Sequence, residues 1–100
     1  MLEKECLIAT DTERLKEFGI NEESGYFDDG IQYSEHLYYY YELGLSYDNK
    51  ESNLYVDYDV NLGEWVINLK YVELEFFDKV MLLLYDLITA GIVKKITNIE

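Results

Sequence analysis

Three stretches of the chain alternate apolar and polar residues at every second position, over residues 37–47, 54–60 and 65–71. Successive side chains of a β-strand point to opposite faces, so this period predicts strands with one buried and one exposed face. Short polar turns at 48–52 and 61–64 join the stretches, which predicts a three-stranded antiparallel β-meander. The positions expected to face a core are Leu37, Tyr39, Tyr41, Leu43, Leu45, Tyr47, Leu54, Val56, Tyr58, Val60, Trp65, Ile67, Leu69 and Tyr71.

A C-terminal helix is predicted over residues 74–90, where apolar residues recur at helical spacing and few polar residues interrupt them. Gly91 stands at the position where a helix commonly ends. A helix this apolar must be covered on most sides, so we expect it to pack across the inner face of the meander. The tail at 92–99 is consistent with an edge strand or with a contact to a second copy.

The N-terminal part predicts a short helix. Residues 10–13 read Thr-Asp-Thr-Glu, which fits a capping box, and Gly19 and Ile20 fit a left-handed helix end closed by an apolar contact. Residues 6–9 fit either a strand or a helical turn, and residues 21–35 are predicted to form a loop. The expected fold is therefore a single α+β domain over residues 1–100, with a short N-terminal helix, the meander and the apolar C-terminal helix.

The charge balance narrows the classes of partner. Twenty-one acidic residues stand against eight basic ones, for a formal net charge of −13. Between residues 20 and 69 the chain holds eleven acidic residues and one basic residue, Lys50. Such a field repels nucleic acids and anionic membranes, and it attracts basic proteins. With no apolar run of membrane-spanning length, no signal-like start and a single cysteine, the chain is expected in the cytoplasm.

Residues that catalysis usually needs are scarce. The chain has one histidine, His36, and it lacks a glycine-rich phosphate loop, a Walker lysine and a Cys-x-x-Cys motif. Glu35 precedes His36, but adjacent residues of a strand point to opposite faces, so the pair is poorly placed for mutual activation. We expect neither an enzyme nor a cofactor.

Residues 57–68 match the pattern of a calcium-binding loop only in part. Asp57, Asp59 and Asn61 resemble the first ligands of such a loop. Leu62 then stands where the turn glycine belongs, and Asn68 stands where the bidentate acid belongs. A strand with acidic outer positions explains the same residues, so no metal is expected.

The acidic face of the meander is the candidate site. If Val56 faces inward, its neighbours in the alternation point outward, and acidic residues of the adjoining strands and turns extend the same surface. Exposed tyrosines supply contact area, and carboxylates supply charge. The residues expected to bind a partner are Tyr38, Tyr40, Glu42, Asp48, Glu51, Tyr55, Asp57, Asp59 and Glu64. A charged outer face is also the default for an antiparallel sheet, so solubility alone is the competing interpretation.

In size and composition the chain resembles phage-encoded nucleic-acid mimics such as anti-restriction and anti-CRISPR proteins. That resemblance implies an inhibitor that occupies a basic nucleic-acid-binding surface of a partner. Two alternatives stand beside it. One is an immunity protein that neutralises a cognate toxin such as a nuclease, and the other is a non-enzymatic structural protein whose apolar helix is covered by a second copy in a homodimer. All three readings expect no direct contact with nucleic acid or membrane.

Overall fold

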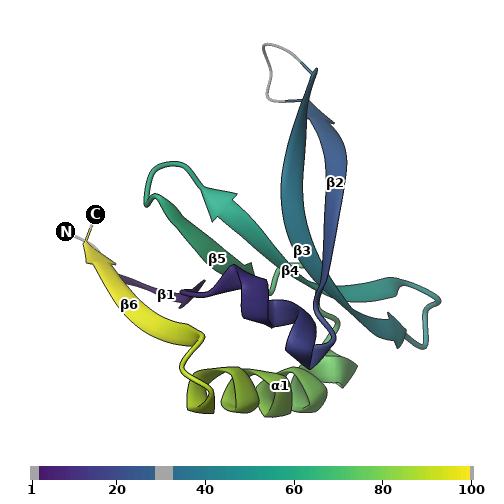
Figure 1. Cartoon of the computed structure of the whole chain (residues 1–100). Coiled ribbons are helices and arrows are strands. Elements are labelled where there is room, and N and C mark those ends of the chain that lie inside the picture. The colour runs from purple at the N-terminus through teal and green to yellow at the C-terminus, as the bar shows by residue number, and fades with distance from the viewer. Residues whose placement is uncertain (1–2, 29–32, 100) are drawn as a thin grey trace.

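The computed structural model describes residues 3–28 and 33–99, and their side chains over 6–25 and 35–96 (Figure 1). The protein is α+β, with a six-stranded antiparallel sheet and a C-terminal helix packed on it. The strands run in the order β2-β3-β4-β5-β1-β6. The elements in chain order are β1 (Glu3–Ala9), the 3₁₀ helix η1 (Thr12–Phe18), β2 (Asn21–Asp28), β3 (Tyr33–Leu45), β4 (Glu51–Asp59), β5 (Glu64–Asn68), the 3₁₀ turn η2 (Leu74–Phe76), α1 (Phe77–Thr89) and β6 (Val93–Ile99).

The predicted meander is confirmed as β3, β4 and β5, which are consecutive neighbours in the sheet. The sheet is larger than predicted, because both ends of the chain add strands to it. β1 pairs with β5 and with β6, so residues 6–9 belong to a strand and the tail forms the edge strand. The first and last strands lie side by side in Figure 1.

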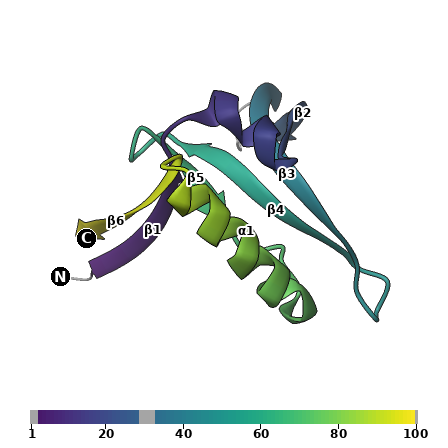
Figure 2. The ribbon, with the colours of Figure 1, turned by 60° about the horizontal axis from the view of Figure 1, so that its bottom comes forward.

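The core lies between one face of the sheet and the two helices, η1 and α1 (Figure 2). In the middle of the sheet, Tyr39, Val56 and Ile67 are cross-strand partners and all three are buried. The helices cover this face with a further set of buried side chains: Leu15, Val80, Leu83, Leu84 and Leu87. Within the described ranges, no helix has the length and apolar character needed to cross a bilayer.

The loop predicted over residues 21–35 is wrong. Residues 21–28 form β2, which pairs with the first half of β3, and the hairpin projects beyond the helices in Figure 1. A strand that extends past the helix layer has no face to bury, so it does not need alternating apolar residues. Its stability comes from backbone hydrogen bonds, which a side-chain pattern does not report.

The predicted inward alternation in β3 ends at residue 43. The register with β4 shifts between Glu42 and Gly44, so Gly44 takes the place opposite the buried Ser52. Gly44 has a φ of +130°, which glycine adopts readily. This bulge turns Leu45 to the other face, where it is exposed, and Tyr47 is exposed in the following turn.

Other positions expected to face inward are exposed. Leu37, which pairs with Ser24, and Tyr58, which pairs with Trp65, have the parity of the buried face but are not buried. Val60 lies in the turn after β4, and Tyr71 follows β5, and both are exposed. For Leu37 and Tyr58 the alternation predicts the face correctly, but burial also needs a layer on that face. Val60 and Tyr71 lie outside the strands, where the alternation no longer determines the face.

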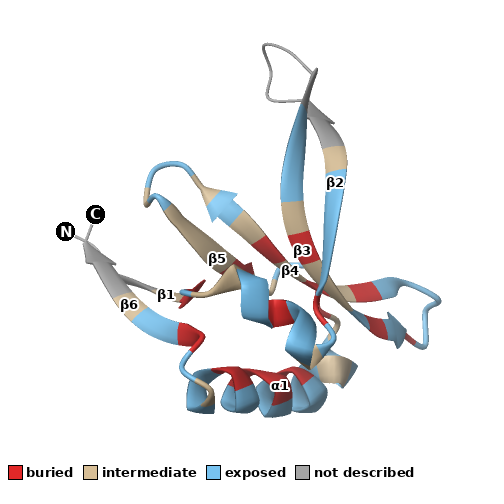
Figure 3. Cartoon of the chain, in the orientation of Figure 1, coloured by how far each residue is buried: buried red, intermediate tan, exposed pale blue. Residues whose placement is uncertain are grey.

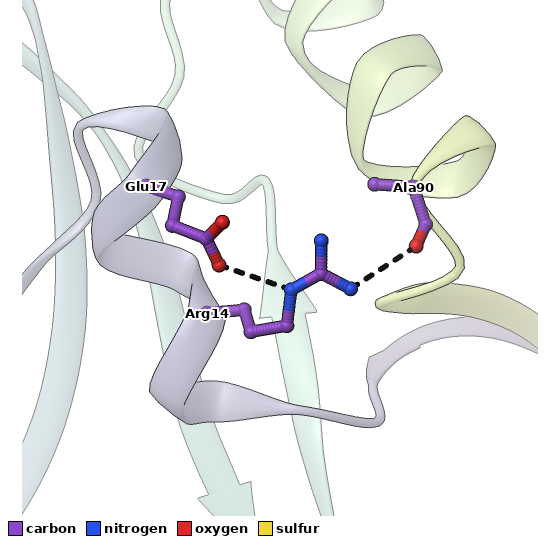
Figure 4. A network of polar contacts seen from close by, with 3 residues as sticks. All are labelled: Arg14, Glu17 and Ala90. Atoms are coloured by element: carbon purple, nitrogen blue, oxygen red, sulfur yellow. Dashed lines mark hydrogen bonds and ion pairs between the residues drawn. The ribbon is translucent and has the colours of Figure 1, made fainter.

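The N-terminal helix forms as the 3₁₀ helix η1, without the predicted capping box. Thr10 Oγ1 donates to the Gly91 carbonyl at 3.3 Å, and Asp11, the N-cap residue, makes no side-chain cap hydrogen bond. The predicted helix end is confirmed: Gly19 is left-handed, and the Ile20 amide donates to the Leu15 carbonyl at 3.2 Å. Arg14 lies between the helices, with Nε 3.0 Å from Glu17 Oε2 and Nη1 3.4 Å from the Ala90 carbonyl at the end of α1 (Figure 4). Gly91 follows with a positive φ, as expected.

Candidate functional site

The sheet has a second face, opposite the helices, that we call the outer face. Directly paired residues of antiparallel strands share a face. Tyr40 pairs with Tyr55, and Tyr55 pairs with Asn68, each one residue away from the buried row. Glu42 pairs with Asn53, and Glu23 of β2 pairs with Tyr38. The outward parity predicted for Tyr38, Tyr40, Glu42 and Tyr55 follows from this register.

Tyrosine rings form a connected array across the outer face. The ring centroids of Tyr38 and Tyr40 are 6.2 Å apart, and those of Tyr38 and Tyr55 are 5.9 Å apart. Tyr55 meets Tyr71 edge to face at 5.6 Å. At the far end, the Lys70 ammonium lies 5.5 Å from the centroid of the Tyr71 ring. The array therefore offers ring faces and edges, and one of its members already holds a cation in the way cation–π contacts predict.

A hollow of about 500 Å³ lies beside these rings. Its lining combines three tyrosines with three carboxylates and, among the described residues, no basic side chain: Glu23, Ser24, Tyr38, Tyr40, Glu42, Gly44, Leu45, Glu51, Asn53 and Tyr55. Leu45 enters the lining because of the bulge in β3. A second hollow of about 580 Å³ shares Tyr38 and Tyr55 and adds Asp57, Asn68 and Tyr71. The two tyrosines thus form a wall between the hollows.

The electrostatics of the first hollow favour a cation. Burial raises the pKa of the Tyr38 hydroxyl above the ordinary value of a tyrosine, and the negative charge of Glu23 raises it further. Burial, the larger cause, disfavours a charge of either sign, whereas the neighbouring carboxylates disfavour a negative charge and favour a positive one. Between residues whose side chains are described, the single ion pair joins Arg14 and Glu17 on η1. The carboxylates of the outer face take no part in it.

The predicted site residues separate into two groups. Tyr38, Tyr40, Glu42, Glu51 and Tyr55 line the first hollow. Asp57 lies one row away, where its Oδ2 accepts a hydrogen bond from Asn68 Nδ2 at 3.1 Å, and it lines the second hollow. The rest lie apart from the first hollow: Asp48 in the exposed turn between β3 and β4, and Asp59 and Glu64 as cross-strand partners at the turn between β4 and β5.

Asp59 has a structural task. Its Oδ1 accepts the backbone amides of Asn61 at 2.9 Å and Leu62 at 3.1 Å, which closes the turn after β4. We expect Asp59→Ala to lower the free energy of unfolding by about 1–2 kcal/mol, because two amides lose their charged acceptor. Urea denaturation measures the change. Asp48→Ala, an exposed acid in the neighbouring hairpin turn, serves as the control and should change stability by less than about 0.5 kcal/mol. Equal effects of the two substitutions would contradict the structural role.

Sequence reasoning missed Glu23, Ser24 and Asn53 as parts of the hollow. Glu23 and Ser24 lie in the segment predicted as a loop, 21–35, and they reach the site because β2 pairs with β3. Asn53 is the outward neighbour of Leu54, and the predicted alternation already contained that signal. Asn53 Nδ2 donates to Tyr55 Oη at 3.2 Å, so it orients one of the rings.

Comparison with protein-family models, with curated protein sequences and with solved structures finds no match to this chain. The geometry of the outer face is therefore the basis of the functional argument.

Proposed function

We propose that this protein is an inhibitor that binds a basic protein through its outer face and occupies the surface where that partner holds nucleic acid. The observation that carries the proposal is the first hollow, where Glu23, Glu42 and Glu51 surround the rings of Tyr38, Tyr40 and Tyr55. Carboxylates pair with arginine and lysine side chains, and tyrosine faces stack on their cationic groups.

The combination of charge and rings is what favours a nucleic-acid site as the target. Proteins hold nucleic acids with basic side chains for the phosphates and, on single strands, with stacking groups for the bases. A surface that presents carboxylates beside flat aromatic rings offers both contacts to the same groove. The hollow also has no described basic residue in its lining, so the cations are expected from the partner.

The test is a pull-down with the tagged chain from host lysate, followed by purification of the captured protein and titration of the pair. We expect the dissociation constant to rise at least about tenfold between 50 and 300 mM salt, since exposed charges are screened. The partner's own nucleic acid should displace the chain in a competition assay. A complex that forms equally well at both salt concentrations, or that binds nucleic acid at the same time, contradicts the proposal. Simultaneous binding would favour the immunity-protein alternative, in which the chain covers a surface beside the catalytic groove.

A further inference from the structure

The C-terminal helix carries a second apolar surface that its own sheet does not cover. Beside the buried positions of α1, six large apolar residues are exposed along η2 and α1, and Figure 3 colours most of the helix away from the sheet as exposed. Five of them follow one side of the helix, and we call these five the helix stripe: Leu74, Phe77, Met81, Tyr85 and Ile88. The sixth, Leu82, lies outside the stripe. Their exposed fractions run from 37% for Phe77 to 80% for Leu74.

The helix stripe is a continuous row. Its members are three or four residues apart, and residues at this spacing are neighbours on a helix surface. With 3.6 residues per turn, the stripe lies about a quarter of a turn from the buried row of Val80, Leu84 and Leu87. Asp86 and Lys79 lie on the remaining side of the helix. The helix therefore has two apolar sectors, and the described part of the chain covers one of them.

The exposed area matches what a dimer needs. A large apolar or aromatic side chain presents about 200 Å² when fully exposed, so the five fractions correspond to roughly 600 Å² per chain. Two such surfaces bury roughly 1,200 Å² in total, above the ~1,000 Å² expected of a specific interface. An exposed apolar patch of this size lies at the upper end of what monomers present, and such patches are often functional.

We propose that a second copy of this chain covers the helix stripe, in a dimer with twofold symmetry. A twofold interface uses the same patch on both subunits, and a row of neutral apolar side chains is complementary to itself. No member of the stripe is charged, so the side chains that meet across the twofold axis carry none of the formal net charge of −13. That same charge repels anionic lipid surfaces.

The dimer has a consequence for the outer face. α1 packs on one face of the sheet and the outer face is the other, so contact through the helix stripe leaves both outer faces exposed. The dimer then presents two acidic surfaces and binds two copies of a basic partner. The dimer itself does not depend on the proposed function, because different residues carry it.

The test measures the mass of the purified full-length chain by sedimentation, from 1 to 200 μM and at 50 and 500 mM salt. We expect the mass of two chains at high concentration. Added salt should strengthen the dimer, because it screens the repulsion between two acidic chains. The salt dependence expected for the dimer is opposite to that expected for partner binding, so an experiment can contradict either proposal without contradicting the other.

Two tyrosines provide a matched pair of variants. Tyr85→Lys places a cation in the helix stripe and should weaken the dimer by about 30-fold or more, the effect expected of an interface anchor. Tyr47→Lys makes the same change at an exposed tyrosine of the hairpin turn and should leave the dimer intact. Because both side chains are exposed, both variants should keep the circular dichroism spectrum of the parent.

Three outcomes overturn the proposal: the mass of one chain at all concentrations and both salt conditions, equal dimerisation of the Tyr85→Lys and Tyr47→Lys variants, or a dimer that salt weakens. A one-chain mass together with binding to phosphatidylcholine vesicles that Tyr85→Lys abolishes would assign the stripe to a lipid surface instead.

Discussion

Replacing Leu84 by alanine is expected to lower the free energy of unfolding by about 2–5 kcal/mol. Leu84 lies in the buried row of α1 and is 4% exposed, within the cluster that joins the helix to the sheet. Removal of the isobutyl group loses its transfer free energy and leaves a cavity that the neighbouring strands fill incompletely. Urea denaturation at low protein concentration, followed by circular dichroism, measures the change.

Leu82 provides the control on the same helix. It is 70% exposed and lies two residues from Leu84, so Leu82→Ala removes the same atoms from the solvent side. We expect it to change stability by less than about 0.5 kcal/mol. If Leu84→Ala were equally mild, the helix would not pack on the sheet through this row, and the position of the outer face opposite the helix would lose its basis.

Reversing the three carboxylates of the first hollow is expected to have the largest effect on binding. Glu23→Lys, Glu42→Lys and Glu51→Lys together should raise the dissociation constant of the partner complex by roughly 100-fold or more, since each change replaces an attraction by a repulsion. All three side chains are exposed, and none forms an ion pair with a described residue. The fold should therefore remain intact. Isothermal titration calorimetry with the captured partner measures the loss.

A second triple variant separates local chemistry from net charge. Glu13→Lys, Glu22→Lys and Asp86→Lys make the same change in net charge at exposed positions away from the hollow. Glu22 is the strongest comparison, because it neighbours Glu23 but pairs with the buried Tyr39 and so belongs to the other face. We expect this variant to bind within a few-fold of the parent. Equal losses from both variants would show that the overall field binds the partner and that the hollow has no particular role.

The two proposed surfaces use different physics. The outer face joins charge to aromatic rings, and such contacts weaken as salt rises. The helix stripe is apolar and neutral, and its contact with a second copy strengthens as salt screens the repulsion between chains. A salt series on the parent chain and on the Tyr85→Lys variant therefore measures both surfaces in one set of experiments.

The alternation along the chain predicted the faces of the central strands correctly. Tyr39, Val56 and Ile67 share the buried face, and Tyr38, Tyr40 and Tyr55 follow on the other. This succeeds because the direction of a side chain in a strand depends on its own backbone, which makes it a local property. The same local rule failed at Leu45, where a bulge shifted the parity by one residue.

Which strands pair, and which part of a sheet face the helices cover, are not local properties in this sense. β2, whose segment is predicted as a loop, supplies Glu23 to the hollow, and β1 and β6, whose segments each fit more than one interpretation, form one edge of the sheet. Strands pair through backbone amides and carbonyls that nearly all residues carry, so the side-chain pattern does not say which strands meet. Burial of a sheet face also depends on which other segments pack on it, and Leu37 and Tyr58 are exposed in spite of their parity.

The amino-acid sequence alone determined the acidic, tyrosine-rich character of the protein, its central meander and its apolar C-terminal helix. It did so because composition and periodicity are properties of each segment taken separately. Which carboxylates meet which rings depended on strand order and on one bulge in β3. The structure likewise decides which apolar side of α1 packs on the sheet and which side stays exposed. Both are properties of contacts between segments distant in the chain, and their energies depend on how those segments come together.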